Sequence, residues 1–184
     1  MLTFLARIPA MFLRNLSAAL LGCALLAAPA SAIAAGRGPS TPEERKQALD
    51  YIRDLQANPL GPQALDERRW MLKWLAEIPD VSVHLCGITL DGLPKVDKKD
   101  TALVIFAQLI SQAAFLIQNP DRQDDLLAQY QAGVEGELQV YEVLLKSNPK
   151  DRQPYLDDLI QRREAGTLAQ WVKERAAVTQ GCLK

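Results

Sequence analysis

The stretch between residues 41 and 178 repeats one pattern: apolar side chains recur every three or four residues, and a proline or glycine ends each run. This spacing places the apolar residues on one face of an α-helix. Proline cannot continue a helix interior, because it lacks an N–H and its ring clashes with the preceding turn. The sequence therefore predicts an all-α fold of about six helices in an irregular bundle or array, with junctions at Asn58-Pro59, Asn119-Pro120 and Asn148-Pro149.

Two capping boxes are predicted, one at Thr41 with Pro42 and Glu44, the other at Thr167 with Gln170. They begin the first and the sixth helix. The four helices between them are predicted over residues 62–78, over residues 101–118, from a cap at residues 119–121 to residue 146, and from residue 149 to a terminating Gly166.

Two of these helices carry further packing information. The helix over residues 62–78 has Leu65 and Leu72 roughly opposite its main apolar face, so we expect it to be packed between neighbours. The fourth helix holds Gly133 and Gly136, although mid-helix glycine is unfavourable. These glycines predict either a kink or a close helix crossing, with the small residues Ala107, Ala113 and Ala114 as its partners.

A different pattern occupies residues 81–90. Apolar and other side chains alternate with a period of two, which is typical of extended backbone. We expect one short extended connector or half of a small hairpin, built on Val81, Val83 and Leu85 alternating with Ser82, His84 and Cys86.

The first 40 residues have the composition of an export signal. Arg7 and Arg14 precede a long apolar run, Pro29 breaks it, and small residues follow. We expect a signal peptide over residues 1–32, cleaved after Ala32 or Ala34, a flexible lead-in over residues 33–40 and a single helical domain over residues 41–184.

Two alternatives share this leader. Cys23 follows Leu-Leu-Gly, so a lipoprotein anchored through an acylated Cys23 is one of them. The other is an uncleaved membrane anchor, because residues 16–35 are nearly long enough to span a bilayer. All three interpretations export the domain to the periplasm or the extracellular space, and membrane contact is expected only through this N-terminal segment.

Export determines what the charge and cysteine content mean. Without the leader, 19 basic residues face 22 acidic ones, a net charge of −3 that does not favour nucleic acid. Cys86 and Cys182 are then the two remaining cysteines, and an even pair in an oxidising compartment predicts a disulfide. Two separate thiols are the alternative.

Candidates for chemistry are few, and no catalytic residue, metal site or cofactor is predicted. His84 and Cys86 would share a face of an extended segment, yet one histidine and two cysteines leave a nucleophilic or zinc site short of groups. The pairs Asp124-Asp125 and Asp157-Asp158 fit early helical turns, where acidic residues are favourable. Glu135 and Glu137 lie among the small residues of the fourth helix, with nothing to single them out.

Two groups of residues are candidates for a binding site. Gln108, Ser111 and Gln112 form a polar stripe on an otherwise apolar helix, which is either a ligand groove or the solvated side of that helix. Trp70 and Trp74 are either stacking residues or core residues, and their apolar neighbours favour the core.

The function predicted is that of a non-catalytic, exported module that binds a protein or peptide partner in the cell envelope. A cell-envelope hydrolase using carboxylates and a structural subunit of an envelope assembly are the alternatives. A hydrolase requires acidic side chains that converge in a cleft, whereas a binding module requires an exposed apolar groove.

Overall fold

Six α-helices follow one another in the computed structural model, which describes residues 37–93 and 99–183. The predicted all-α fold is confirmed. Two short 3₁₀ turns, Leu90–Gly92 (η1) and Pro149–Asp151 (η2), join the helices: α1 (Pro42–Ala57), α2 (Ala64–Glu77), α3 (Lys99–Gln118), α4 (Leu126–Ser147), α5 (Pro154–Glu164) and α6 (Leu168–Val178).

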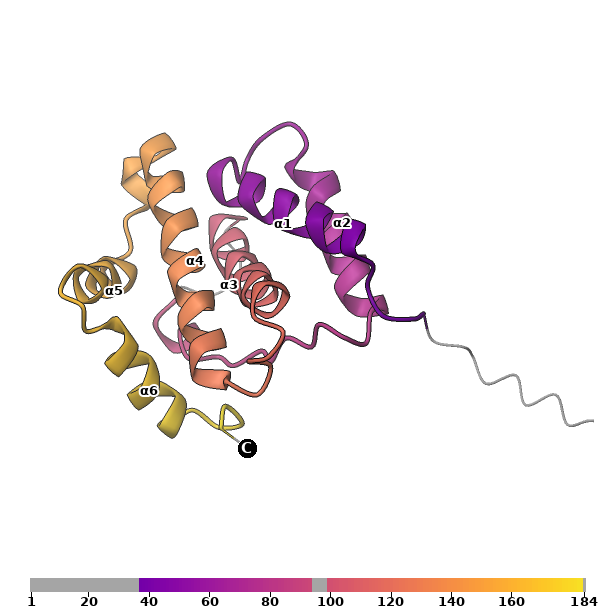
Figure 1. Ribbon diagram of the computed structural model, residues 1–184. Helices are drawn as coiled ribbons and strands as arrows, with labels where there is room; N and C mark the ends of the chain where they lie inside the picture. Colours follow the sequence, from indigo (N-terminus) through magenta and orange to yellow (C-terminus); the bar gives the residue numbers. More distant parts are fainter. Residues whose placement is uncertain (1–36, 94–98, 184) are drawn as a thin grey trace, which may run out of the picture. The chain divides into compact units, whose positions relative to one another are not determined.

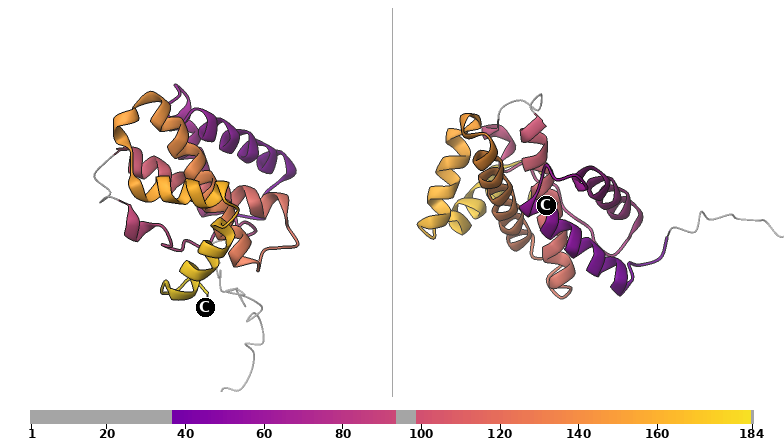
Figure 2. Two further views of the ribbon diagram at one scale, coloured as in Figure 1. Left: turned by 90° about the vertical axis from the view of Figure 1, so that its left-hand side faces the viewer. Right: turned by 90° about the horizontal axis from the view of Figure 1, so that it is seen from above.

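Helices α3 and α4 pack along each other at the centre of the described unit, with α1 and α2 on one side and α5 and α6 on the other (Figures 1 and 2). Two apolar clusters result. One joins α3 to α1 and α2 through Ile110, Ala113 and Leu116. The other joins α3 to α4, α5 and α6, and includes Val104 and Ala107. Helix α3 therefore serves both clusters, as its apolar circumference requires.

Within the described residues, α3 alone is long and apolar enough, by length and composition, to cross a bilayer. Its span Asp100–Gln118 is 56% buried inside the fold. The helix therefore fits the central core position that its sequence predicts.

Helix starts were predicted with mixed success. The capping box at Thr41 is present in both directions, with the Thr41 side chain accepting from the Glu44 N–H. The predicted cap at residues 119–121 is wrong, because a turn intervenes and Asp125 caps α4 by accepting from the Ala128 N–H at 3.1 Å. Helix α5 begins at Pro154, since residues 149–151 form η2 instead.

The second predicted capping box is also wrong. Thr167 does precede α6, but its hydroxyl donates to the Arg162 carbonyl and makes no cap hydrogen bond. Gly166 does end α5 with a left-handed φ of 70°, which glycine adopts without strain.

The last residue of the predicted lead-in, Ser40, is hydrogen-bonded to the helical domain. Ser40 is buried and donates from its N–H and its hydroxyl to the carboxylate of Asp80, at 2.7 and 2.6 Å. Arg45 donates to the same carboxylate at 2.6 Å. These bonds join the start of the domain to the segment after α2. The predicted signal peptide and its cleavage sites lie outside the described residues.

The segment from residue 79 to residue 89 is a connector without regular secondary structure (Figure 1). It forms no hairpin: within the described residues, the backbone of Ile88–Thr89 pairs with no preceding strand, and the Leu90 N–H closes a turn on the Gly87 carbonyl. Of the two predicted forms, the extended connector is the one observed.

The two mid-helix glycines of α4 lie at a close crossing with α3, so that alternative is confirmed over a kink. A Cβ built on Gly136 would overlap the Ser111 side chain, and one on Gly133 would lie 3.0 Å from the side chains of Gln108 and Gln112. The partners are thus larger polar residues of α3 and not the alanines that the sequence indicated.

Candidate functional site

The polar stripe of α3 lies in the interior of the protein. Gln108, Ser111 and Gln112 are 3%, 5% and 0% exposed, because Gly133 and Gly136 let α4 cover them closely. Ser111 donates to the Ala107 carbonyl at 2.7 Å and accepts from Gln56 of α1 at 2.8 Å. The stripe is therefore neither an open ligand groove nor a solvated helix face. It is a buried polar seam between three helices.

Glu137 of α4 adds a carboxyl group to the interior. Its side chain is 0% exposed, and neither carboxyl oxygen has a hydrogen-bond partner within 3.5 Å among the described residues. Burial raises the pKa of Glu137 to about 8, although the Thr89 hydroxyl nearby favours the ionised form. Burial thus favours the protonated, neutral form of this carboxyl group, and the sequence offered no signal that would have separated it from Glu135.

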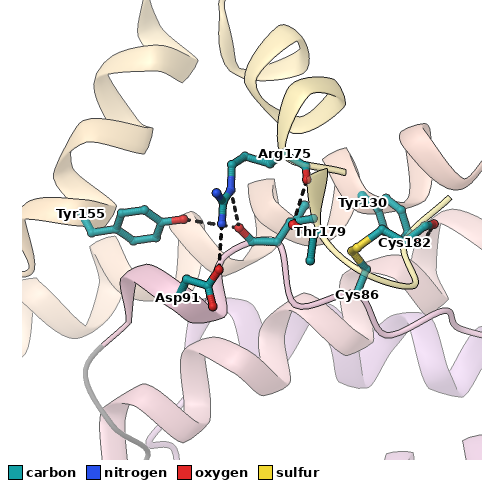
Figure 3. The surroundings of a disulfide bond; sticks show 8 residues. Cys86, Asp91, Tyr130, Tyr155, Arg175, Thr179 and Cys182 are labelled. Carbon is teal, nitrogen blue, oxygen red and sulfur yellow. Dashed lines mark hydrogen bonds and ion pairs between the residues drawn. A yellow bond between two sulfur atoms is a disulfide. The ribbon is translucent and has the colours of Figure 1, made fainter. Parts of the chain in front are cut away.

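The predicted disulfide between Cys86 and Cys182 is present, with a Cα–Cα distance of 5.2 Å. Tyr130 of α4 donates to the Cys182 carbonyl at 2.6 Å, so the tail is held by a second bond (Figure 3). Cys86 is buried whereas His84 is exposed, so the two do not share a face as the alternation predicted. Leu85 is exposed and Cys86 buried, so the period-two pattern ends after His84.

The turn that follows Cys86 is held by α5 and α6. The Ile88 carbonyl accepts from Tyr155 at 3.5 Å and from Arg175 at 3.4 Å, and Arg175 also pairs with Asp91 at 3.1 Å. Figure 3 shows Tyr155 and Arg175 converging beside the disulfide. Burial raises the pKa of Tyr155 to about 12, so its hydroxyl is a neutral donor. The far end of the connector is consequently anchored by side chains from both C-terminal helices.

Three residues of the two acidic pairs have structural partners. Asp125 caps α4 and pairs with Arg122, and Asp158 pairs with Arg162. Asp157 accepts from the Tyr141 hydroxyl at 3.0 Å and from Arg152 at 3.2 Å. Neither sequence pair forms a dyad of facing carboxylates.

A charged hollow of about 430 Å³ lies between α4 and α5 and is lined by Glu142, Lys146, Arg152 and Asp157, among others. Two of its lining residues, Glu142 and Asp157, carry the carboxylates that the hydrolase alternative requires. Glu142, however, accepts two bonds from Arg163, at 2.7 and 3.1 Å. Since Asp157 is bonded to Tyr141 and Arg152, both carboxylates already serve the packing of α4 against η2 and α5.

No group of three or more His, Cys, Asp or Glu side chains that could hold a metal ion occurs in the part of the chain that the structure describes. Trp74 is buried in the core, and Trp70 is half-buried and packs against the same apolar cluster. Trp70 and Trp74 stack at 5.4 Å between ring centroids, and Tyr51 of α1 meets Trp70 edge-on at 5.2 Å.

Helix α2 has an uncovered apolar face. Its main face packs through Met71 and Trp74, but Leu65 and Leu72 on the opposite side are half exposed. The expectation that α2 is packed between neighbours is therefore wrong within the described residues. Helix α2 lies at the surface, because α1 and α3 cover only one of its sides.

An apolar groove of about 450 Å³, which we call the connector groove, lies beside this face. Leu72 is 50% exposed and Leu85 is 71% exposed, so two large apolar side chains of the groove contact solvent. The walls come from the end of α2, the connector and one residue of α3: Leu72, Leu75, Ala76, Ile78, Pro79, Val81, Ser82, Val83, Leu85 and Leu109.

The connector groove was not predicted, although its parts were visible in the sequence. The second apolar face of α2 and the alternating Val81, Val83 and Leu85 were both recognised. Sequence patterns do not show that these two features lie side by side, because the turn at Pro79 sets the angle between them.

Comparison with protein-family models, with curated proteins and with solved structures finds no match for this chain.

Proposed function

We propose that this chain is an exported, non-catalytic binding module that takes an apolar segment of an envelope protein or peptide into the connector groove. The observation that carries the proposal is the groove itself. It combines an uncovered helix face with an exposed Leu85, and contiguous apolar surface of this kind marks interaction sites in soluble proteins.

Burial of Leu72 and Leu85 supplies the driving force. Covering a large aliphatic side chain contributes about 1.5–3 kcal/mol relative to full exposure, and these two retain half or more of their exposure in the free protein. A partner that covers both therefore gains a useful part of its affinity from them.

The disulfide supports the exported location. Disulfides form and persist in oxidising compartments, and Cys86–Cys182 closes a loop of 96 residues. Because Cys86 follows Leu85 directly, oxidation also holds one wall of the groove in place.

Site-specific photocrosslinking in cells that produce the full chain tests the proposal. A benzoylphenylalanine at position 85 should give a discrete protein adduct in the envelope fraction. The same probe at Val178, an exposed apolar position on α6 outside the groove, should not.

A charged substitution in the groove provides the specificity control. Leu72→Lys should remove the adduct from position 85, because the ammonium group cannot be buried against the partner. Leu65→Lys, on the same helix face but outside the groove, should leave it unchanged. Equal adducts from positions 85 and 178, or an adduct indifferent to Leu72→Lys, would contradict the proposal.

A further inference from the structure

The backbone of the connector is unpaired along one wall of the groove. Between Val81 and Cys86, no N–H and no carbonyl has a hydrogen-bond partner among the residues that the structure describes. Unpaired backbone in an extended segment is a template for another strand, because each free group can pair with an incoming chain.

Side-chain orientation in the first half of this segment is that of a strand. Val81 is buried and Val83 half-buried toward the core, whereas Ser82 and His84 are exposed. Val81, Ser82, Val83 and Leu85 all line the groove. A peptide lying alongside would thus find backbone groups on the connector and apolar side chains beside them.

The segment is also anchored at both ends. Asp80 is bonded to Ser40 and Arg45 before it, and Cys86 is joined to Cys182 after it. The ordering cost of binding falls when a site is held in place beforehand. Two anchors six residues apart in the chain therefore prepare the stretch between them for pairing.

We propose that the partner binds as an extended strand, which pairs with the backbone of residues 81–86 and inserts alternate apolar side chains between Leu72, Leu85 and Leu109. This inference rests on the proposed function and specifies the class of ligand. The ligand is a segment with aliphatic residues at every second position, since successive side chains of a strand point to opposite faces.

The probe is a random dodecapeptide phage library, selected on the chain as purified from cells and counter-selected on the Leu72→Lys variant. Selected peptides are expected to carry aliphatic residues two apart. On binding, every second amide of residues 81–86 should gain protection from hydrogen exchange. These are the amides whose N–H groups face the peptide.

Backbone N-methylation of a selected peptide gives the matched control, because it removes single donors and leaves the side chains. Methylation at one set of alternate residues should weaken binding roughly tenfold or more per site, while methylation of the other set should have much less effect.

The possible results distinguish a failure of strand pairing from a failure of the proposed binding function. Peptides that need Leu72 but show helical spacing of three and four, or that leave the connector amides unprotected, contradict strand pairing and leave the binding function standing. If no peptide distinguishes the native chain from the Leu72→Lys variant, both the pairing and the groove's binding role are contradicted.

Discussion

Glu137 departs most from the ordinary behaviour of its residue type. Its carboxyl group is completely buried without a hydrogen-bond partner among the described residues, and burial raises its pKa from 4.5 to about 8. Between pH 4.5 and about 8, the folded state therefore keeps a proton on Glu137 that the unfolded state has lost. Its contribution to stability is complete below pH 4.5 and is lost progressively as the pH rises to about 8.

Glu137→Gln tests this linkage, because the amide has a similar shape and does not ionise. We expect the unfolding free energy of the native chain to fall relative to that of the variant by about 1.4 kcal/mol per pH unit between pH 4.5 and 8. Urea denaturation of both proteins at pH 5, 6, 7 and 8 measures the difference. A constant difference across that range would show that the carboxyl is not held neutral.

For single residues, the sequence predicts which side chains share a helix face, but not whether that face is buried. The stripe of Gln108, Ser111 and Gln112 was recognised as polar residues sharing one side of a helix. Its burial depends on Gly133 and Gly136 of another helix, whose approach no local pattern reports. Glu137 lies in the same crossing helix, so its burial could not be predicted from the sequence either.

Among the elements, the crossing of α3 and α4 requires the absence of a side chain at Gly136. We expect Gly136→Ala to destabilise the protein by about 1–3 kcal/mol, although the same change in an exposed helix is favourable by about 1 kcal/mol. The new Cβ would overlap both Cβ and Oγ of Ser111. Chemical denaturation measures the change.

A second substitution distinguishes this clash from a general helix effect. In the Gly136→Ala background, Ser111→Gly should recover more of the loss than Ser111→Ala, because removing Oγ alone still leaves the Ser111 Cβ 2.5 Å from the new Cβ. Recovery by neither change, or a stabilising Gly136→Ala, would contradict the close crossing.

The bond network around Asp80 joins the start of the domain to the connector. Burial raises the pKa of Asp80, but hydrogen bonds from Ser40 and Arg45 outweigh it and lower the pKa to about 2. The contribution of the ionised Asp80 carboxylate to the free energy of unfolding is present above the usual pKa of 3.8 and is lost as the pH falls toward 2.

We therefore expect Asp80→Asn to be less stable than the native chain by about 1–2 kcal/mol at pH 7. The gap should narrow as the pH falls through 3.8 toward 2. Thermal unfolding at pH 7 and at several acidic values provides the comparison. A gap that is the same at pH 7 and near pH 2 would show that the carboxylate charge contributes nothing.

Helix order and number were predictable because each run of apolar residues is long and ends at proline or glycine. Starts were predictable only where the cap is local and unambiguous, as at Thr41. After Asn119-Pro120 and Asn148-Pro149 the chain makes a turn before the helix begins, at Leu126 and Pro154. Proline permits a turn and a first helical residue equally well, so these boundaries were placed too early.

Across the whole molecule, the disulfide links the C-terminal tail to the connector. In the chain-entropy model, a closed loop of 96 residues contributes on the order of 4–5 kcal/mol. We expect Cys86→Ser with Cys182→Ser to lower the unfolding free energy by roughly this amount and to weaken groove binding. A loss below about 1 kcal/mol would contradict a stabilising role.

The bridge could be predicted from the sequence, since that prediction depends on a count of cysteines, whereas the exported location stays a prediction. The connector groove could not, because it forms where α2, the connector and α3 meet, and these elements are up to 37 residues apart in its lining from Leu72 to Leu109. The predicted binding residues Gln108 and Gln112 are buried, so the proposed binding site lies instead at the surface beside Leu85.

Export of the chain and oxidation of Cys86 and Cys182 are the premises on which the proposed function rests most directly. Intact-mass measurement of the protein from its own cells, after thiol alkylation without reduction, tests both together. We predict a chain that begins at Ile33 or Ala35 and carries no alkyl group. An intact chain of 184 residues with alkylated cysteines would contradict the account, and an acylated chain beginning at Cys23 would replace the cleaved secreted form by a lipoprotein.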